Sequence, residues 1–155
     1  MKPNELIRAI AITIVGIGLM VGLQPWLFYS ETIFLGDVDL EDWFPQYQIG
    51  TWVVLAPTLM VSLIWLLATS TIKPKGGNVD VSTWRVLWFL LFLFPVLAIC
   101  AALYFFNPSD AALIWLVVFY TVDVLCLYWL VTVTSTPGAY VYVPPLGLFV
   151  RRLLR

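Results

Sequence analysis

Four long apolar segments limit what this chain can fold into more than any other feature of its sequence. They cover residues 6–29, 49–72, 84–106 and 111–134. A helix rises about 1.5 Å per residue, so each segment is long enough to cross a hydrocarbon core about 30 Å thick. The chain is 62% hydrophobic and 11% charged, whereas about a quarter of the residues in an average soluble domain are charged. We therefore predict an all-α integral membrane protein, with a four-transmembrane-helix bundle over residues 1–134 and a tail over residues 135–155.

The basic residues are placed so that all of them fall on one side of a four-span bundle. The eight Lys and Arg residues lie at the start of the first segment, between the second and third segments, and after the fourth. Loop 30–48 carries only acidic charges. Because cytoplasmic loops are enriched in Lys and Arg, we predict that both termini are cytoplasmic and that the acidic loop faces outward. This topology fits a multi-pass protein of a bacterial-type inner membrane or an equivalent one.

Aromatic residues are expected at both membrane interfaces. Trp26 and Trp52 would lie toward the outer headgroups, and Trp65 and Trp88 toward the inner ones. Such belts are typical of membrane proteins, because these rings combine an apolar body with a polar N–H.

The sequence contains no histidine, and this excludes several classes of chemistry. Ser-His and Cys-His catalysis require histidine, which is also the commonest protein ligand of zinc and haem. Cys100 and Cys126 lie at different predicted depths and are expected to pack as small apolar residues. We therefore predict that the protein is not an enzyme and has no cofactor, no metal centre and no nucleic-acid partner. Whether it binds a lipid or a pigment stays open.

Asp123 is the one charged residue within segment 111–134. It lies near the middle of that segment, where an ionised carboxylate costs about 2.5 to 3.5 kcal/mol on insertion scales. We therefore expect it to face protein, in its neutral form, with Tyr120 and the hydroxyls of residues 58–62 as hydrogen-bond partners. Under one hypothesis it joins helices within a subunit or an oligomer. Under the other it titrates or binds a cation in a path through the membrane.

Two further patterns predict helix contacts within the membrane. Hydroxyl residues at spacings of seven, four and seven form a stripe on segment 49–72: Thr51, Thr58, Ser62 and Thr69. Either these hydroxyls bond to carbonyls of their own or a neighbouring helix, or the stripe lines a wet path. In the first segment, Gly18 and Gly22 form a small-xxx-small pair that would let another helix approach closely.

The acidic loop 30–48 is a candidate site for a divalent cation or a protein partner. In an extended conformation Asp37, Asp39 and Glu41 would share one face, with Asp42 beside them. Hard cations take several carboxylate oxygens, although the spacing does not match a calcium-binding EF-hand loop. The alternative is a solvated loop whose apolar residues rest on the bilayer or on the helix ends.

The tail combines prolines and glycines with a basic, amphipathic end. Its last residues separate apolar side chains from Arg151, Arg152 and Arg155 on a helical wheel. This pattern predicts a short helix in the inner headgroup layer, held by apolar burial and by attraction to anionic lipid. The helix would serve as a membrane-surface anchor, or alternatively as a docking segment for a cytoplasmic partner.

These observations favour a small tetraspan membrane subunit without enzymatic activity, which assembles with itself or with a larger membrane complex. An alternative is an oligomeric ion channel or membrane-permeabilising pore, with Asp123 or the hydroxyl stripe lining the path. A third and weaker alternative is a small ion-coupled carrier.

Overall fold

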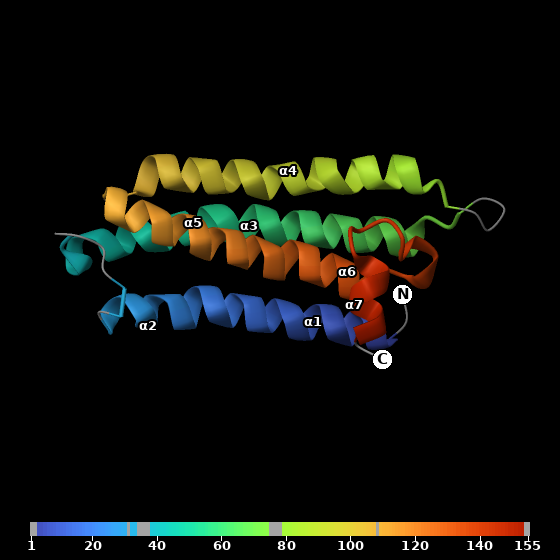
Figure 1. Ribbon diagram of the computed structural model, residues 1–155, viewed down its shortest axis with the longest axis horizontal. Helices are drawn as coiled ribbons and strands as arrows, with labels where there is room; N and C mark the ends of the chain where they lie inside the picture. The colour runs from blue at the N-terminus through green and yellow to red at the C-terminus, as the bar shows by residue number, and fades with distance from the viewer. Residues whose placement is uncertain (1–2, 31, 34–37, 75–78, 108, 154–155) are drawn as a thin grey trace.

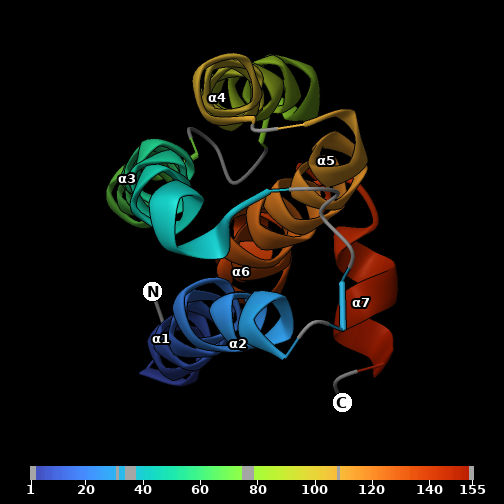
Figure 2. The ribbon, with the colours of Figure 1, turned by 90° about the vertical axis from the view of Figure 1, so that its left-hand side faces the viewer.

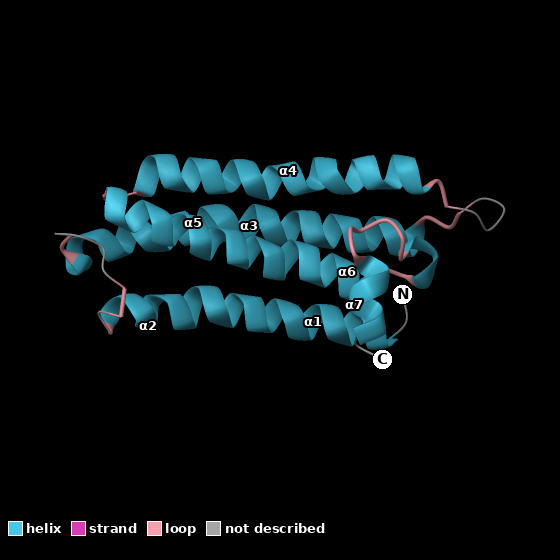
Figure 3. Ribbon diagram, in the orientation of Figure 1, coloured by secondary structure: helices cyan, strands magenta, loops and turns pink. Residues whose placement is uncertain are grey.

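The computed structural model describes residues 3–30, 32–33, 38–74, 79–107 and 109–153, and every regular element in them is a helix (Figures 1 and 3). Four helical spans are long and apolar enough to cross a membrane: Pro3–Tyr29, Leu40–Thr71, Val81–Phe106 and Asp110–Ser135. They confirm the predicted all-α class with four candidate membrane helices.

The spans are built from the following helices. The first contains α1 (Pro3–Gly18), the π-helical turn η1 (Leu19–Leu23) and α2 (Gln24–Tyr29). The second and third are α3 (Leu40–Thr71) and α4 (Val81–Phe106). The fourth contains α5 (Asp110–Val124), the π-helical turn η3 (Leu125–Leu130) and α6 (Val131–Ser135). The tail contains the 3-10 turn η4 (Gly138–Tyr140) and α7 (Gly147–Leu153).

Side-chain caps determine where three of the spans begin. The Asp39 carboxylate accepts a hydrogen bond from the backbone N–H of Glu41, so α3 begins at Leu40. Asp80 caps α4 and Ser109 caps α5 in the same way. The predicted bounds of the second helix are thereby corrected, because residues 40–48 of the expected loop are helical. The extended conformation considered for Asp37, Asp39 and Glu41 is wrong at Glu41, which lies in the first turn of α3, whereas Asp37 lies outside the described residues.

The fourth span is the centre of the bundle. Seen end on, α5 and α6 lie between α4 on one side and α1 on the other, with α3 beside them (Figure 2). The fourth span also crosses obliquely, whereas α1 and α4 run nearly parallel to each other (Figure 1). The largest buried side chains come mainly from the second and fourth spans: Trp65, Tyr47, Tyr120, Tyr128, Leu55, Leu116 and Leu127.

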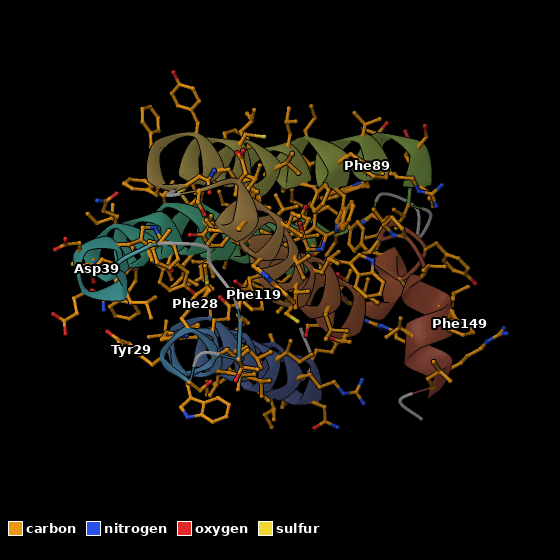
Figure 4. The ribbon with its side chains drawn as sticks, turned by 60° about the vertical axis from the view of Figure 1, so that its left-hand side comes forward. Phe28, Tyr29, Asp39, Phe89, Phe119 and Phe149 are labelled. Atoms are coloured by element: carbon orange, nitrogen blue, oxygen red, sulfur yellow. The ribbon has the colours of Figure 1, made fainter. Side chains whose placement is uncertain are left out.

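Both ends of the described chain lie at the same end of the bundle (Figure 1). There the tail folds back against the spans: the Tyr140 hydroxyl donates to the carbonyl of Ile72 at 2.6 Å, and the Trp65 indole donates to the Thr136 hydroxyl at 2.9 Å. Val143 is fully buried. Part of the tail thus belongs to the bundle, whereas Tyr142, Leu146 and the α7 residue Phe149 expose their apolar side chains (Phe149 is labelled in Figure 4).

Candidate functional site

A buried polar node joins three of the four spans. The Gln24 side-chain amide donates to Asp123 Oδ1 at 2.7 Å, and the Tyr47 hydroxyl donates to Gln24 Oε1 at 2.9 Å. Gln24 comes from α2, Tyr47 from α3 and Asp123 from α5. All three side chains are at most 4% exposed. We refer to these three residues as the Gln24–Tyr47–Asp123 node.

Two π-helical turns flank the node in sequence. Gln24 directly follows η1, and its backbone N–H bonds to the carbonyl of Leu19, five residues earlier. Asp123 lies two residues before η3. A π turn holds an extra residue compared with an α turn, so it shifts the direction of every side chain beyond it, and such turns are frequent at functional sites. Here η1 lies next to Gln24 and η3 lies close to Asp123, and these are the two node residues whose hydrogen bond connects the first span to the fourth.

Aromatic rings pack around the side of the node that is nearest to the C-terminal end of α2. Phe28 makes edge-to-face contacts with Trp43, Tyr47 and Phe119, with ring centroids 4.9 to 5.6 Å apart. Phe28 and Phe119 face each other between α2 and α5 in Figure 4. This packing excludes water from one side of the node, and a lower local dielectric strengthens its hydrogen bonds.

Among the residues that the structure describes, three buried polar atoms in or beside the node have no hydrogen-bond partner: Asp123 Oδ2, Tyr120 Oη and Thr51 Oγ1. The Tyr120 ring stacks on Tyr47 with centroids 6.5 Å apart. Its hydroxyl lies against Gly50, where a Cβ would come within 2.7 Å of it. The expected hydrogen bond from Tyr120 to Asp123 is absent, and the partner of Asp123 is Gln24 instead. A cavity of about 200 Å³ lies alongside, lined in part by Tyr47 and Thr51.

The other hydroxyls of the predicted stripe are occupied by backbone carbonyls. Thr58 donates to Val54, and Thr69 donates to Trp65, each one turn earlier in α3. Ser62 lies within bonding distance of the carbonyl of Leu127 in the fourth span, at 2.7 Å. Of the four stripe residues only Thr51 lies beside the node. The 58–62 hydroxyls do not reach Asp123.

The predicted glycine pair lies on the outside of the bundle. Gly18 and Gly22 are exposed, and a Cβ at either position would meet no atom within 4 Å. The close approach within the chain occurs at Gly16 instead, where a Cβ would come within 2.5 Å of the Leu127 side chain. The small-residue pair is thus unused by the described chain itself.

The charged candidate sites at the two ends of the bundle are only partly described. Asp37 and Arg155 lie outside the described residues. Asp39 is an N-cap, and Glu41 and Asp42 are exposed in the first turn of α3. Among the described residues no group of three or more His, Cys, Asp or Glu side chains is placed to hold a metal ion. At the opposite end, Arg151 donates to the carbonyl of Val133 at 3.3 Å, whereas Arg152 is exposed.

Sequence reasoning identified Asp123 but missed Gln24 and Tyr47. One signal was present: Gln24 is the one side-chain amide in segment 6–29. A buried amide needs a partner as much as a buried acid does.

Comparisons with protein-family models, curated proteins and solved structures find no match for this chain.

Proposed function

We propose that this chain is a small tetraspan membrane subunit without enzymatic activity, which assembles through its first span with itself or with another membrane protein. The observation that carries the proposal is the open glycine face of Gly18 and Gly22. Helix association in lipid depends on small residues that let two backbones approach closely. This pair has that spacing and is not covered by the rest of the chain.

The buried share of each span also favours the first span as the one that contacts a partner. In its most apolar window, 17% of the first span is buried, compared with 39% for the second and fourth spans and 28% for the third. The first span therefore has the largest uncovered share. A lipid-facing helix needs no glycine, whereas a helix-facing one benefits from it.

The Gln24–Tyr47–Asp123 node contributes by fixing the rotation of the first span. Gln24 lies on the buried side of that span and Gly22 on the exposed side. As long as Gln24 remains bonded to Asp123, the glycine face points away from the bundle. Asp123 then acts as the interhelical contact expected for a neutral buried acid.

Native mass spectrometry after mild extraction tests this proposal, because it gives both the mass and the composition of the assembly. The double variant Gly18→Ile/Gly22→Ile should release a monomer from the native assembly. Ala56→Ile is the matched control, since Ala56 is also a small exposed residue within a span. A native chain that is monomeric in mild detergent, or a glycine variant that assembles normally, would contradict the proposal.

A second candidate function is an ion path, as in an oligomeric channel, a pore or a small ion-coupled carrier. It is favoured by the unpartnered atoms Asp123 Oδ2, Tyr120 Oη and Thr51 Oγ1 beside the node. Three such atoms in one buried place could accept a proton or a desolvated cation.

Ion flux through liposomes separates the two functions. Asp123→Asn keeps an oxygen that can accept from Gln24 but cannot titrate, and Asp110→Asn is a control at the end of the same span. If the chain is a passive subunit, no flux is measured with any of the three proteins. Flux that is present in the native chain and the control, and lost in Asp123→Asn, would establish the ion path instead.

A further inference from the structure

A basic pocket lies where the two ends of the chain meet. Its volume is about 460 Å³, and its lining combines one arginine of α1 with two of α7: Arg8, Arg151 and Arg152, together with Gly138, Val141 and Leu148. Pockets of this size typically hold small-molecule ligands. The pocket was not expected from the sequence, because Arg8 and Arg151 are separated by almost the whole chain.

Arg151 is held in a fixed position at this pocket. Its Nε donates to the carbonyl of Val133, while its Nη2 is buried and has no hydrogen-bond partner among the described residues. A guanidinium N–H buried without an acceptor is costly, and an anion that accepted from it would remove that cost.

The electrostatics around Arg151 indicate an unmet need for negative charge. Burial lowers the pKa of Arg151, the carboxylate of Glu5 raises it, and the guanidinium of Arg8 lowers it further. Within the described part of the chain, three arginines thus share this site with one glutamate. An arginine remains charged in such surroundings, so the excess positive charge persists unless an anion binds.

We infer that the Arg8–Arg151–Arg152 pocket binds a phosphate group, carried either by an anionic lipid headgroup or by a free phosphate. Planar guanidinium groups bind phosphate oxygens through paired N–H donors, and several of them around one pocket favour a dianionic or monoanionic phosphate over a carboxylate. The inference goes beyond general attraction of the tail to the membrane surface, since it requires Arg8 of the first span. Binding would connect α1 to α7.

Thermal unfolding of the full chain in neutral detergent, followed by tryptophan fluorescence at constant ionic strength, tests the inference. Short-chain phosphatidylglycerol and inorganic phosphate are titrated separately, with short-chain diacylglycerol, which has no phosphate and no charge, as the comparison. The variants are Arg8→Gln and Arg152→Gln, both at exposed positions, and the control is Lys73→Gln, an exposed base outside the pocket.

The native chain should show saturable stabilisation with phosphatidylglycerol, with inorganic phosphate, or with both, and the responding probe identifies the source of the phosphate. Each arginine variant should raise the half-saturating concentration about tenfold, the value expected for loss of one charged hydrogen bond. Lys73→Gln should leave it unchanged. No stabilisation by either probe, or an equal change in Lys73→Gln and the arginine variants, would overturn the inference.

Discussion

Replacing Gln24 with methionine tests the structural importance of the Gln24–Tyr47–Asp123 node. Methionine has nearly the same length and volume but neither donates nor accepts a strong hydrogen bond. The change removes the bond to Asp123 Oδ1 and the bond from the Tyr47 hydroxyl, and leaves both groups buried without a partner. Side-chain hydrogen bonds between membrane helices contribute about 0.6 kcal/mol on average and up to about 1.7 kcal/mol. Loss of two bonds should therefore lower the free energy of unfolding by roughly 1 to 3 kcal/mol.

Equilibrium unfolding in mixed micelles with a denaturing detergent measures this free energy. Gln46→Met is the matched control, because Gln46 lies next to Tyr47 in α3 but is exposed. It should change the stability by less than about 0.5 kcal/mol, as is usual for surface positions.

A double-mutant cycle with Tyr47→Phe isolates one bond of the node. Once Gln24 is methionine, removing the Tyr47 hydroxyl should cost less than it does in the native chain, because that hydroxyl then has no acceptor. The difference should be about 0.6 to 1.7 kcal/mol. If Gln24→Met unfolds like the native chain, then the node does not stabilise the bundle; if the two changes are additive, then the bond between Tyr47 and Gln24 does not contribute.

Two further predictions concern helix packing and capping. Gly50→Ala should destabilise the protein by about 1 to 3 kcal/mol in the same unfolding assay, because its Cβ would come within 2.7 Å of the buried Tyr120 hydroxyl; Gly18→Ala, which meets no atom, should not. Hydrogen bonds to the Asp80 carboxylate, the largest from the Thr83 hydroxyl, lower the pKa of Asp80 below its ordinary value of 3.8. The cap thus stabilises α4 above that value and loses its effect as the pH falls through the lowered pKa. Native chain and Asp80→Asn should therefore differ in thermal stability at neutral pH and converge in acid, and a difference independent of pH would contradict this.

Hydropathy was sufficient to predict the four spans, but it did not predict where they begin. The second span starts at Leu40 because Asp39 caps it, and its first turns contain polar residues such as Gln46 and Gln48 that lower the local hydropathy. Capping depends on one side chain and one N–H, whereas hydropathy averages over many residues. The two criteria therefore disagree most at helix ends.

The partners of Asp123 could not be predicted by matching depths along straight helices. Gln24 lies five residues before the end of α2, and Asp123 lies thirteen residues after the start of α5. At helical rise these positions differ by about 12 Å in depth, so they were not expected to meet. In the structure their side chains nevertheless meet, at 2.7 Å, and the fourth span crosses the bundle obliquely (Figure 1).

Two tryptophans near the end of the bundle that holds the tail show that sequence patterns predict side-chain environments only in part. Trp65 and Trp88 were predicted at the inner headgroups, but the structure buries both. Their indoles donate to the hydroxyls of Thr136 and Thr132. An indole N–H needs only one acceptor, and a threonine hydroxyl within the bundle can supply it instead of water or a headgroup at the membrane interface. The composition of a segment does not tell a tryptophan bonded inside the bundle from one at the interface.

The contacts of the tail also affect how the protein can be made. The indole of Trp65 belongs to the second span and the carbonyl of Ile72 follows that span directly, yet they bond to Thr136 and Tyr140, which are translated after all four spans. During synthesis the first three spans therefore reach the membrane before the residues that complete this end of the bundle exist. The bundle closes at this end only once the tail is in place, so a chain that lacks the tail would leave the Trp65 indole without its Thr136 acceptor.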